Sequence, residues 1–154
     1  AYLSEQSHSG DTVSEISCNL DDMTPEAIGY TTQLLLDNGA LDVFTTPVTM
    51  KKSRPAVVLT CLCSPDNKDL LSRLILQHTT TIGLRYQTLR RDVLDYTVYP
   101  VTTPYGDIRI KSASGYGVFK EKPEYEDVKS AAETHGAPFN QVYAAAVSAM
   151  KSNQ

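Results

Sequence analysis

The sequence predicts an α+β protein, with a ferredoxin-like βαββαβ antiparallel sheet followed by a small α+β subdomain. Segments in which apolar and polar residues alternate, typical of strands, are interspersed with segments whose apolar residues recur at helical spacing. Over residues 12–94 the order is strand, helix, strand, strand, helix, strand, which is the split βαβ pattern. Further extended segments and two helical ones follow over residues 95–154.

The first strand and the first helix have clear boundary residues. Residues 1–11 are rich in serine and predict a flexible tail, and residues 13–20 carry the apolar alternation of a strand. Thr24 is a good helix N-cap, and Pro25 fits the first helical position. This helix is expected to end at Gly39, because glycine readily adopts the left-handed conformation that follows a helix.

The rest of the first subdomain is predicted from the same kinds of pattern. Residues 41–50 and 56–63 predict two strands joined as a hairpin. Pro65 opens a second helix, whose leucine and isoleucine residues recur at helical spacing. Residues 81–94 alternate again and predict a long fourth strand, which completes the sheet.

The second subdomain is expected to combine a short sheet with two helices. Residues 96–113 predict two strands joined by a Pro-Tyr-Gly turn, and residues 116–122 form a third extended piece. Pro123 starts a helix that Gly136 ends. Pro138 starts the last helix.

Composition excludes some classes of function. The 154 residues carry a net charge of −4, which argues against a nonspecific nucleic-acid binder. The chain contains no apolar run of about 18 residues, so no membrane span is expected. Three cysteines without a disulfide spacing indicate reduced thiols and a cytoplasmic protein. Two of them, Cys61 and Cys63, share one face of a strand and could bind a soft metal, although buried cysteine more often packs as a small hydrophobe.

Two charged clusters are candidates for chemistry. Lys51, Lys52 and Arg54 concentrate positive charge in one hairpin connection, where they could bind an anion or simply form a solvated tip. Asp21 and Asp22 lie between a strand and a helix. Such carboxylates can bind a divalent cation or accept a proton, and they equally complement the positive end of a helix dipole.

Two further segments are candidates for phosphate binding. Residues 79–81 are threonines followed by Arg85, and hydroxyls with an arginine can bind phosphate, although threonines also favour strand entry. Lys120 and Lys122 alternate toward the helix that begins at Pro123, whose free N–H groups could hold phosphate. The acidic residues that follow fit plain complementation of the helix dipole equally well.

Five separated stretches together resemble the C-terminal domain of the LarC family. They occur in the family's order, and the resemblance runs from about Val13 to Tyr143. The family commonly has Asn and Gly where this chain has Ser53 and Ala56, and these departures leave the cations unchanged. The stretches are NLDDMTPE, GALDVFTTPVTMKKSRP, TTTIGLRY, TPYGDIRIK and KPEYED.

The resemblance implies a nickel insertase, a cyclometallase of the nickel chelatase-type lyases. LarC proteins insert nickel into pyridinium-3,5-bisthiocarboxylic acid mononucleotide and so make the nickel-pincer nucleotide cofactor of lactate racemase. They consume CTP with Mn²⁺ or Mg²⁺, and nickel is the substrate metal. By this resemblance Asp21 and Asp22 are catalytic bases or metal ligands. The residues expected to bind CTP are Lys51, Lys52, Arg54, Arg85, Lys120, Lys122, Glu124 and Tyr125.

The resemblance also implies partners. A full LarC protein has an N-terminal domain in addition, so a C-terminal portion alone is expected to be inactive. Assembly into a homo-oligomer, a trimer or a hexamer, is expected through the ferredoxin-like subdomain. The alternative function is a ferredoxin-like module that oligomerises or binds a small regulatory ligand without catalysis of its own.

Overall fold

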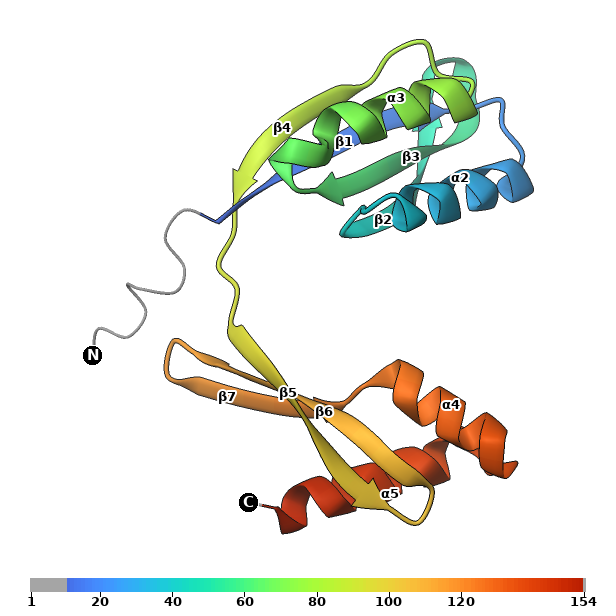
Figure 1. Ribbon diagram of the computed structural model, residues 1–154. Coiled ribbons are helices and arrows are strands. Elements are labelled where there is room, and N and C mark those ends of the chain that lie inside the picture. Colours follow the sequence, from blue (N-terminus) through green and yellow to red (C-terminus); the bar gives the residue numbers. More distant parts are fainter. Residues whose placement is uncertain (1–10, 154) are drawn as a thin grey trace. The chain divides into compact units, whose positions relative to one another are not determined.

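The structure is a computed structural model that describes residues 11–153 (Figure 1). The described residues form two compact units, which divide between Arg91 and Asp92. Apart from Asp11, the tail predicted for residues 1–11 lies outside the described residues. Asp11 accepts a hydrogen bond from Arg91 Nε at 2.8 Å, which joins the two chain ends of the first unit.

The first unit is a four-stranded antiparallel sheet with the strand order β2-β3-β1-β4. This order and two helices on one face make the unit ferredoxin-like, as the sequence predicts. Two short 3₁₀ turns, Lys51–Ser53 and Pro65–Asn67, connect elements. The elements are β1 (Thr12–Leu20), α2 (Pro25–Asp37), β2 (Asp42–Met50), β3 (Arg54–Cys63), α3 (Lys68–His78) and β4 (Arg85–Arg90).

Two predicted boundaries in this unit were wrong. The fourth strand was expected over residues 81–94, but β4 has only 6 residues, because β1 offers it partners only from Thr12 to Ser17. The second helix was expected to open at Pro65, whereas α3 begins at Lys68 after a 3₁₀ turn.

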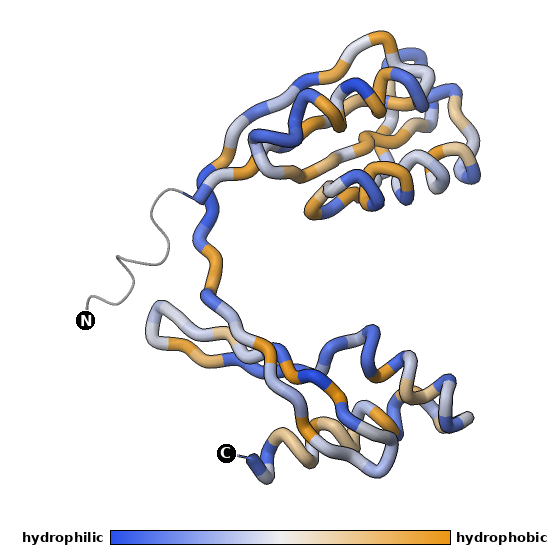
Figure 2. Tube along the Cα trace, viewed as in Figure 1, coloured by the Kyte–Doolittle hydropathy of each residue, from blue (hydrophilic) through white to orange (hydrophobic). Residues whose placement is uncertain are grey.

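The core of the first unit lies between the sheet and its helices, which cover the same face (Figure 1). Side chains alternate across a strand, so Ile16 faces the helices while Ser17 projects from the opposite face. Figure 2 shows this alternation as changes of hydropathy along β1 and β3. The buried residues are Ile16, Cys18, Leu20, Leu35, Val43, Leu59, Cys61, Cys63, Leu71 and Ile75.

The second unit is a three-stranded antiparallel sheet with the order β5-β6-β7 and two helices. The three strands and two helices that the sequence predicts here are present, but the expected helix start at Pro123 was wrong: Pro123 pairs with Ile110 as the last residue of β7, and α4 begins at Tyr125. The elements are β5 (Asp95–Thr103), β6 (Gly106–Gly115), β7 (Val118–Pro123), α4 (Tyr125–His135) and α5 (Phe139–Ser152). Its core consists of Val101, Ile108, Ile110, Val128, Ala132, Val142, Ala146 and Met150.

One ionic contact fixes the start of α4 on the sheet. Asp127 accepts hydrogen bonds from the Arg109 backbone N–H at 2.8 Å, from Nε at 2.9 Å and from Nη2 at 2.8 Å. The side-chain hydrogen bonds from Arg109 lower the pKa of Asp127. Asp127 therefore complements the helix dipole and ties α4 to β6.

Two glycines of the first unit should respond oppositely to alanine. Gly39 has φ +98°, and a Cβ there would lie 2.8 Å from Asn67 Nδ2, the donor to Asn38 O. Gly29 lies within α2, where an added Cβ meets nothing within 4 Å. We expect G39A to lower the free energy of unfolding by about 1–2 kcal/mol and G29A to raise it by up to about 1 kcal/mol. Urea unfolding followed by circular dichroism measures both, and shifts of the same sign would contradict this account.

Candidate functional site

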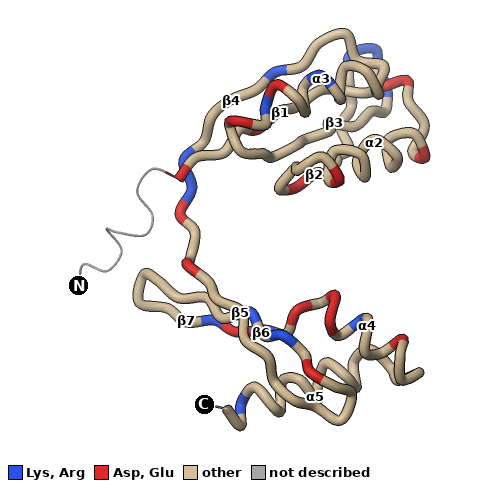
Figure 3. Tube along the Cα trace, viewed as in Figure 1, with Lys and Arg blue, Asp and Glu red and all other residues tan. Residues whose placement is uncertain are grey.

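Three loops of the first unit meet at one end of its sheet. Because the neighbouring strands are antiparallel, the end of β1, the tip of the β2–β3 hairpin and the start of β4 share this end. Figure 3 shows basic and acidic residues close together there. We call this region the sheet-end site and define it by residues from these three connections: Asp21, Asp22, Lys51, Lys52, Arg54, Thr80 and Arg85.

Asp21 is held by Arg54 across the sheet end. Arg54 Nη1 lies 3.3 Å from Asp21 Oδ2, and the two side chains are 55% and 24% exposed. A single exposed ion pair contributes at most about 1 kcal/mol to stability. An incoming anion could therefore take the Arg54 guanidinium without much loss of folding free energy.

Asp22 is held by a threonine of the loop between α3 and β4. Thr80 Oγ1 donates to Asp22 Oδ1 at 2.5 Å. The adjacent threonines serve the backbone instead: Thr79 Oγ1 donates to Ile75 O at 2.7 Å, and Thr81 Oγ1 donates to Gly83 O at 2.7 Å. Of the three hydroxyls predicted to bind phosphate, two are thus committed to local structure, and Thr80 positions a carboxylate.

The hairpin tip presents its lysines to solvent. Lys51 and Lys52 are exposed, and neither forms an ion pair with any residue of the described chain. Lys52 has φ +63° and Ser53 has φ +59°, a left-handed conformation that few residues other than glycine adopt.

Arg85 begins β4 on the face of the sheet that the helices leave open. It pairs in register with Ser17, whose side chain points away from the core. It lines a shallow cavity of about 220 Å³ together with Glu15, Tyr86 and Gln87.

The three cysteines pack in the core of the first unit. Cys18, Cys61 and Cys63 are at most 1% exposed. Burial raises the pKa of Cys18 to about 11 and that of Cys61 to about 12, and it also raises the pKa of Cys63. Within residues 11–153 no group of three or more His, Cys, Asp or Glu side chains is placed to hold a metal ion.

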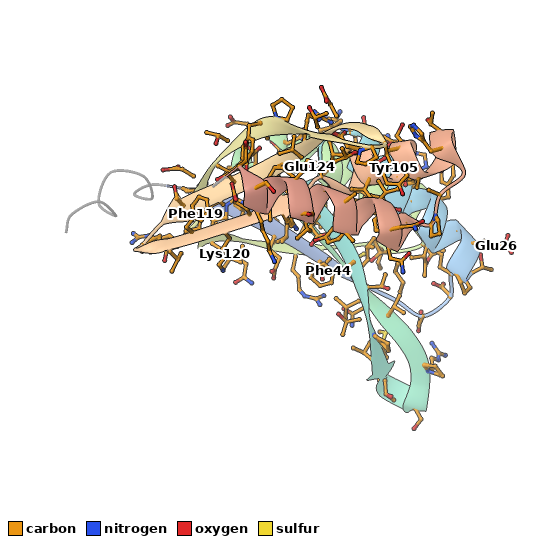
Figure 4. All side chains as sticks on the ribbon, turned by 90° about the horizontal axis from the view of Figure 1, so that it is seen from below. Glu26, Phe44, Tyr105, Phe119, Lys120 and Glu124 are labelled. Atoms are coloured by element: carbon orange, nitrogen blue, oxygen red, sulfur yellow. The ribbon has the colours of Figure 1, made fainter. Side chains whose placement is uncertain are left out.

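Three of the four predicted binding residues of the second unit line one cavity of about 370 Å³. Lys122, Glu124 and Tyr125 line it. Lys120, labelled with Glu124 in Figure 4, precedes Lys122 by two residues on β7 and does not line this cavity. We call this cavity the aromatic pocket; its other lining residues are Lys111, Pro123, Phe139 and Tyr143.

Sequence reasoning identified Tyr125 but missed the two other aromatic residues of this pocket, Phe139 and Tyr143. The ring centroids of Tyr125 and Phe139 lie 5.5 Å apart, and those of Phe139 and Tyr143 lie 6.2 Å apart with planes 25° from parallel. Their spacing on α5, four residues, is also that of core positions, so only their exposure distinguishes them. Phe139 is 41% and Tyr143 37% exposed.

The chain is thus a two-unit α+β protein with a charged sheet end in one unit and an aromatic–lysine cavity in the other. The family model described as nickel insertion protein matches residues 1–143, and the chain belongs to this family. In the described residues no helix is long and apolar enough to cross a membrane.

Curated relatives are similar over most of this chain but are much longer. A pyridinium-3,5-bisthiocarboxylic acid mononucleotide nickel insertion protein of Lactiplantibacillus plantarum is 47% identical over 150 residues, 96% of this chain and 36% of that protein. The protein of the same description from Geobacillus kaustophilus is 49% identical over 137 residues, 88% of this chain and 33% of that one. The chain therefore spans about a third of the length of these relatives.

Solved structures agree with the fold. The apo C-terminal domain of a cyclometallase involved in the synthesis of the NPN cofactor of lactate racemase has a TM-score of 0.86 and 48% identity, covering 92% of this chain and 98% of that one. A protein of Methanopyrus kandleri has a TM-score of 0.62 at 24% identity over 91% of this chain and 89% of that one, which shows the fold alone. The resemblance seen in the sequence is confirmed.

The buried thiols should react only slowly with thiol reagents while the protein is folded. With their pKa raised by burial, Cys18 and Cys61 carry almost no thiolate near pH 8. We expect a disulfide reagent such as 5,5′-dithiobis(2-nitrobenzoic acid) to react at pH 8 at least about a hundredfold more slowly in buffer than in urea. A thiol that reacts quickly in the folded protein would reopen the possibility of a thiolate metal ligand.

Proposed function

We propose that this chain is the C-terminal part of a nickel insertase. The full protein would insert nickel into pyridinium-3,5-bisthiocarboxylic acid mononucleotide, making the nickel-pincer cofactor of lactate racemase. The observation that carries this proposal is the match to the cyclometallase C-terminal domain over 92% of the chain at 48% identity. Since the chain spans only 36% of its relative in Lactiplantibacillus plantarum, we propose that activity requires an N-terminal domain and that this part alone is inactive.

We propose CTP with Mn²⁺ or Mg²⁺ as the nucleotide bound at the sheet-end site. The cations there suit a triphosphate: Arg54 is in an exchangeable ion pair, Lys51 and Lys52 are exposed, and Arg85 begins the adjacent strand. Charge-assisted hydrogen bonds contribute about 1.5–3 kcal/mol each. Several such bonds would hold a triphosphate without a strongly basic surface.

Asp21 and Asp22 fit a divalent cation that is bound mainly through phosphate. Mg²⁺ and Mn²⁺ prefer oxygen ligands, and Mg²⁺ is commonly held by one or two carboxylates together with substrate phosphates and water. Two exposed carboxylates match that pattern. A bound divalent ion would neutralise phosphate charge. We propose that Asp22, one oxygen of which accepts from Thr80, keeps its other oxygen for the metal or for the proton released during metalation.

Lys120, Lys122, Glu124 and Tyr125 lie in the second unit, and we propose them as nucleotide-binding residues of the same reaction. The reduced state of the three cysteines is consistent with the cytoplasm as the compartment in which the reaction occurs.

One observation favours oligomerisation by the first unit. An apolar hollow of about 420 Å³ lies between α2 and β2, a strand at the edge of the sheet. Phe44, labelled in Figure 4, lines it and is 43% exposed, and Ile28 and Val43 also line it. We propose homo-oligomerisation as an additional role and, if CTP does not bind, as the alternative function.

Removal of the hairpin cations should weaken CTP binding but leave stability unchanged. We expect R54A with K52A to weaken CTP binding in the presence of Mn²⁺ by about a hundredfold, because two charge-assisted hydrogen bonds are lost. R73A, which removes an exposed arginine from α3, is the matched control. Isothermal titration calorimetry measures affinity, and thermal unfolding should shift little. Unchanged affinity in the double variant would place the triphosphate elsewhere.

Removal of either carboxylate should reduce nickel insertion in the full-length protein. D21A and D22A are each expected to lower the rate of cofactor formation by at least about tenfold, through loss of a metal ligand or of a general base. D66A, an exposed carboxylate in the turn before α3, is the control. Activation of lactate racemase by the product reports the rate. Full activity of both variants would return these residues to a helix-dipole role.

A further inference from the structure

Two lysines are directly opposite each other beside the aromatic pocket. Lys111 of β6 and Lys122 of β7 are partners in the antiparallel register, so their side chains project from the same face. Like charges in this position destabilise a sheet. Lys111 Nζ is compensated in part, since it lies 3.6 Å from Glu124 Oε1 and 4.7 Å from the Tyr96 ring centroid. Lys122 has no ion pair with any residue of the described chain, so an anionic ligand would supply the missing compensation.

Aromatic rings from two helices lie beside these lysines. Tyr125 belongs to α4, while Phe139 and Tyr143 are one turn apart on α5. Solvent reaches all three, which are 59%, 41% and 37% exposed. Exposed aromatic faces carry negative electrostatic potential and attract cations, ring cations among them. The pocket of about 370 Å³ is also within the range of small-molecule sites.

We propose that the aromatic pocket binds a pyridinium mononucleotide, with the positive ring on the aromatic faces and the phosphate on the lysines. The inference rests on the proposed function for its choice of nucleotide, because relatives of this chain are described as acting on pyridinium-3,5-bisthiocarboxylic acid mononucleotide. Phe139, Tyr143 and Lys111 are then binding residues in addition to Lys122, Glu124 and Tyr125.

The chemistry of the lining distinguishes this ligand from a neutral nucleobase. A base is selected through hydrogen bonds along its edge, and apart from the two lysines the lining side chains that can form them are Glu124 and the tyrosine hydroxyls. Glu124 already interacts with Lys111. A positive ring needs aromatic faces and a nearby carboxylate, and both are present. The anionic carboxyl and phosphate groups of such a nucleotide suit the opposed lysines.

Nicotinic acid mononucleotide is a direct probe, because it carries a pyridinium ring, a carboxylate and a phosphate. Cytidine 5′-monophosphate is the matched control, with the same phosphate and a neutral ring. We expect the pyridinium nucleotide to bind this chain at least about tenfold more tightly than the cytidine nucleotide. Its ring protons should shift upfield in NMR titrations, as stacking on aromatic faces requires.

Variants separate the ring contact from the charge contact. F139L and Y143L should each weaken binding of the pyridinium nucleotide by about three- to tenfold, and Y143F, which keeps the ring, should bind as the parent does. K122M should weaken binding of both nucleotides. Y30L, which removes an exposed tyrosine from α2, is the control and should change neither.

Three outcomes would overturn the proposal: equal affinity for the two nucleotides, no binding of the pyridinium nucleotide, or unchanged affinity in both F139L and Y143L. None of these depends on nickel insertion. If D21A and D22A left nickel insertion intact, the proposed role of those carboxylates would fall while the pyridinium titration could still succeed.

Discussion

β1 is hydrogen-bonded along both edges, to β3 from Ser14–Cys63 to Leu20–Val57 and to β4 from Thr12–Arg90 to Ser17–Arg85. Because both partners are antiparallel, this pairing brings the loops that carry Asp21, Arg54 and Thr80 to one end of the sheet. A slip of one residue would turn Ile16 out of the core and Ser17 into it. The apolar alternation that builds the core therefore also fixes the position of the charged residues of the sheet-end site.

Charged residues that stabilise the fold differ from those that we assign to ligands. Asp127 receives three hydrogen bonds from Arg109, which fixes both groups. Arg54 makes one long contact with Asp21 and is half exposed, so it holds its partner weakly. Lys111 and Lys122 repel each other across the sheet, and only Lys111 is compensated in part, by Glu124 and Tyr96. A cation that contributes little to the free energy of folding can bind an anion at little cost to stability. For this reason we assign ligands to these cations.

The sequence was sufficient for the order of the elements but not for all of their ends. The alternation of apolar and polar residues and the helix-capping residues identified every strand and every long helix. Both patterns follow directly from the local geometry of the backbone. The extended residues beyond β4 at both ends were assigned to a strand because β-branched and apolar residues favour extended backbone. A strand also needs a partner, and β1 pairs with β4 only from Thr12 to Ser17. In the candidate sites, Asp21 and Arg54 could be foreseen as neighbours from the topology alone. The exposure of Phe139 and Tyr143 could not be predicted from the sequence. Residues four apart on a helix share a face, and only tertiary packing decides whether that face is buried or exposed.

The proposed reaction would consume one nucleotide and metalate another, which requires two binding surfaces of different chemistry, and the two units differ in this way. The sheet-end site consists of carboxylates, a hydroxyl and exposed cations, which match phosphate oxygens and a hard divalent ion. The aromatic ring beside it, that of Tyr86, already has Lys68 Nζ 3.5 Å from its centroid. The aromatic pocket offers ring surface and two opposed lysines, with a single carboxylate. A triphosphate in the aromatic pocket would find one carboxylate for its metal, Glu124, which already interacts with Lys111. A pyridinium ring at the sheet end would have to displace Lys68 from the ring of Tyr86. We therefore propose one nucleotide for each unit, because this arrangement gives the metal two carboxylates and the positive ring three aromatic side chains.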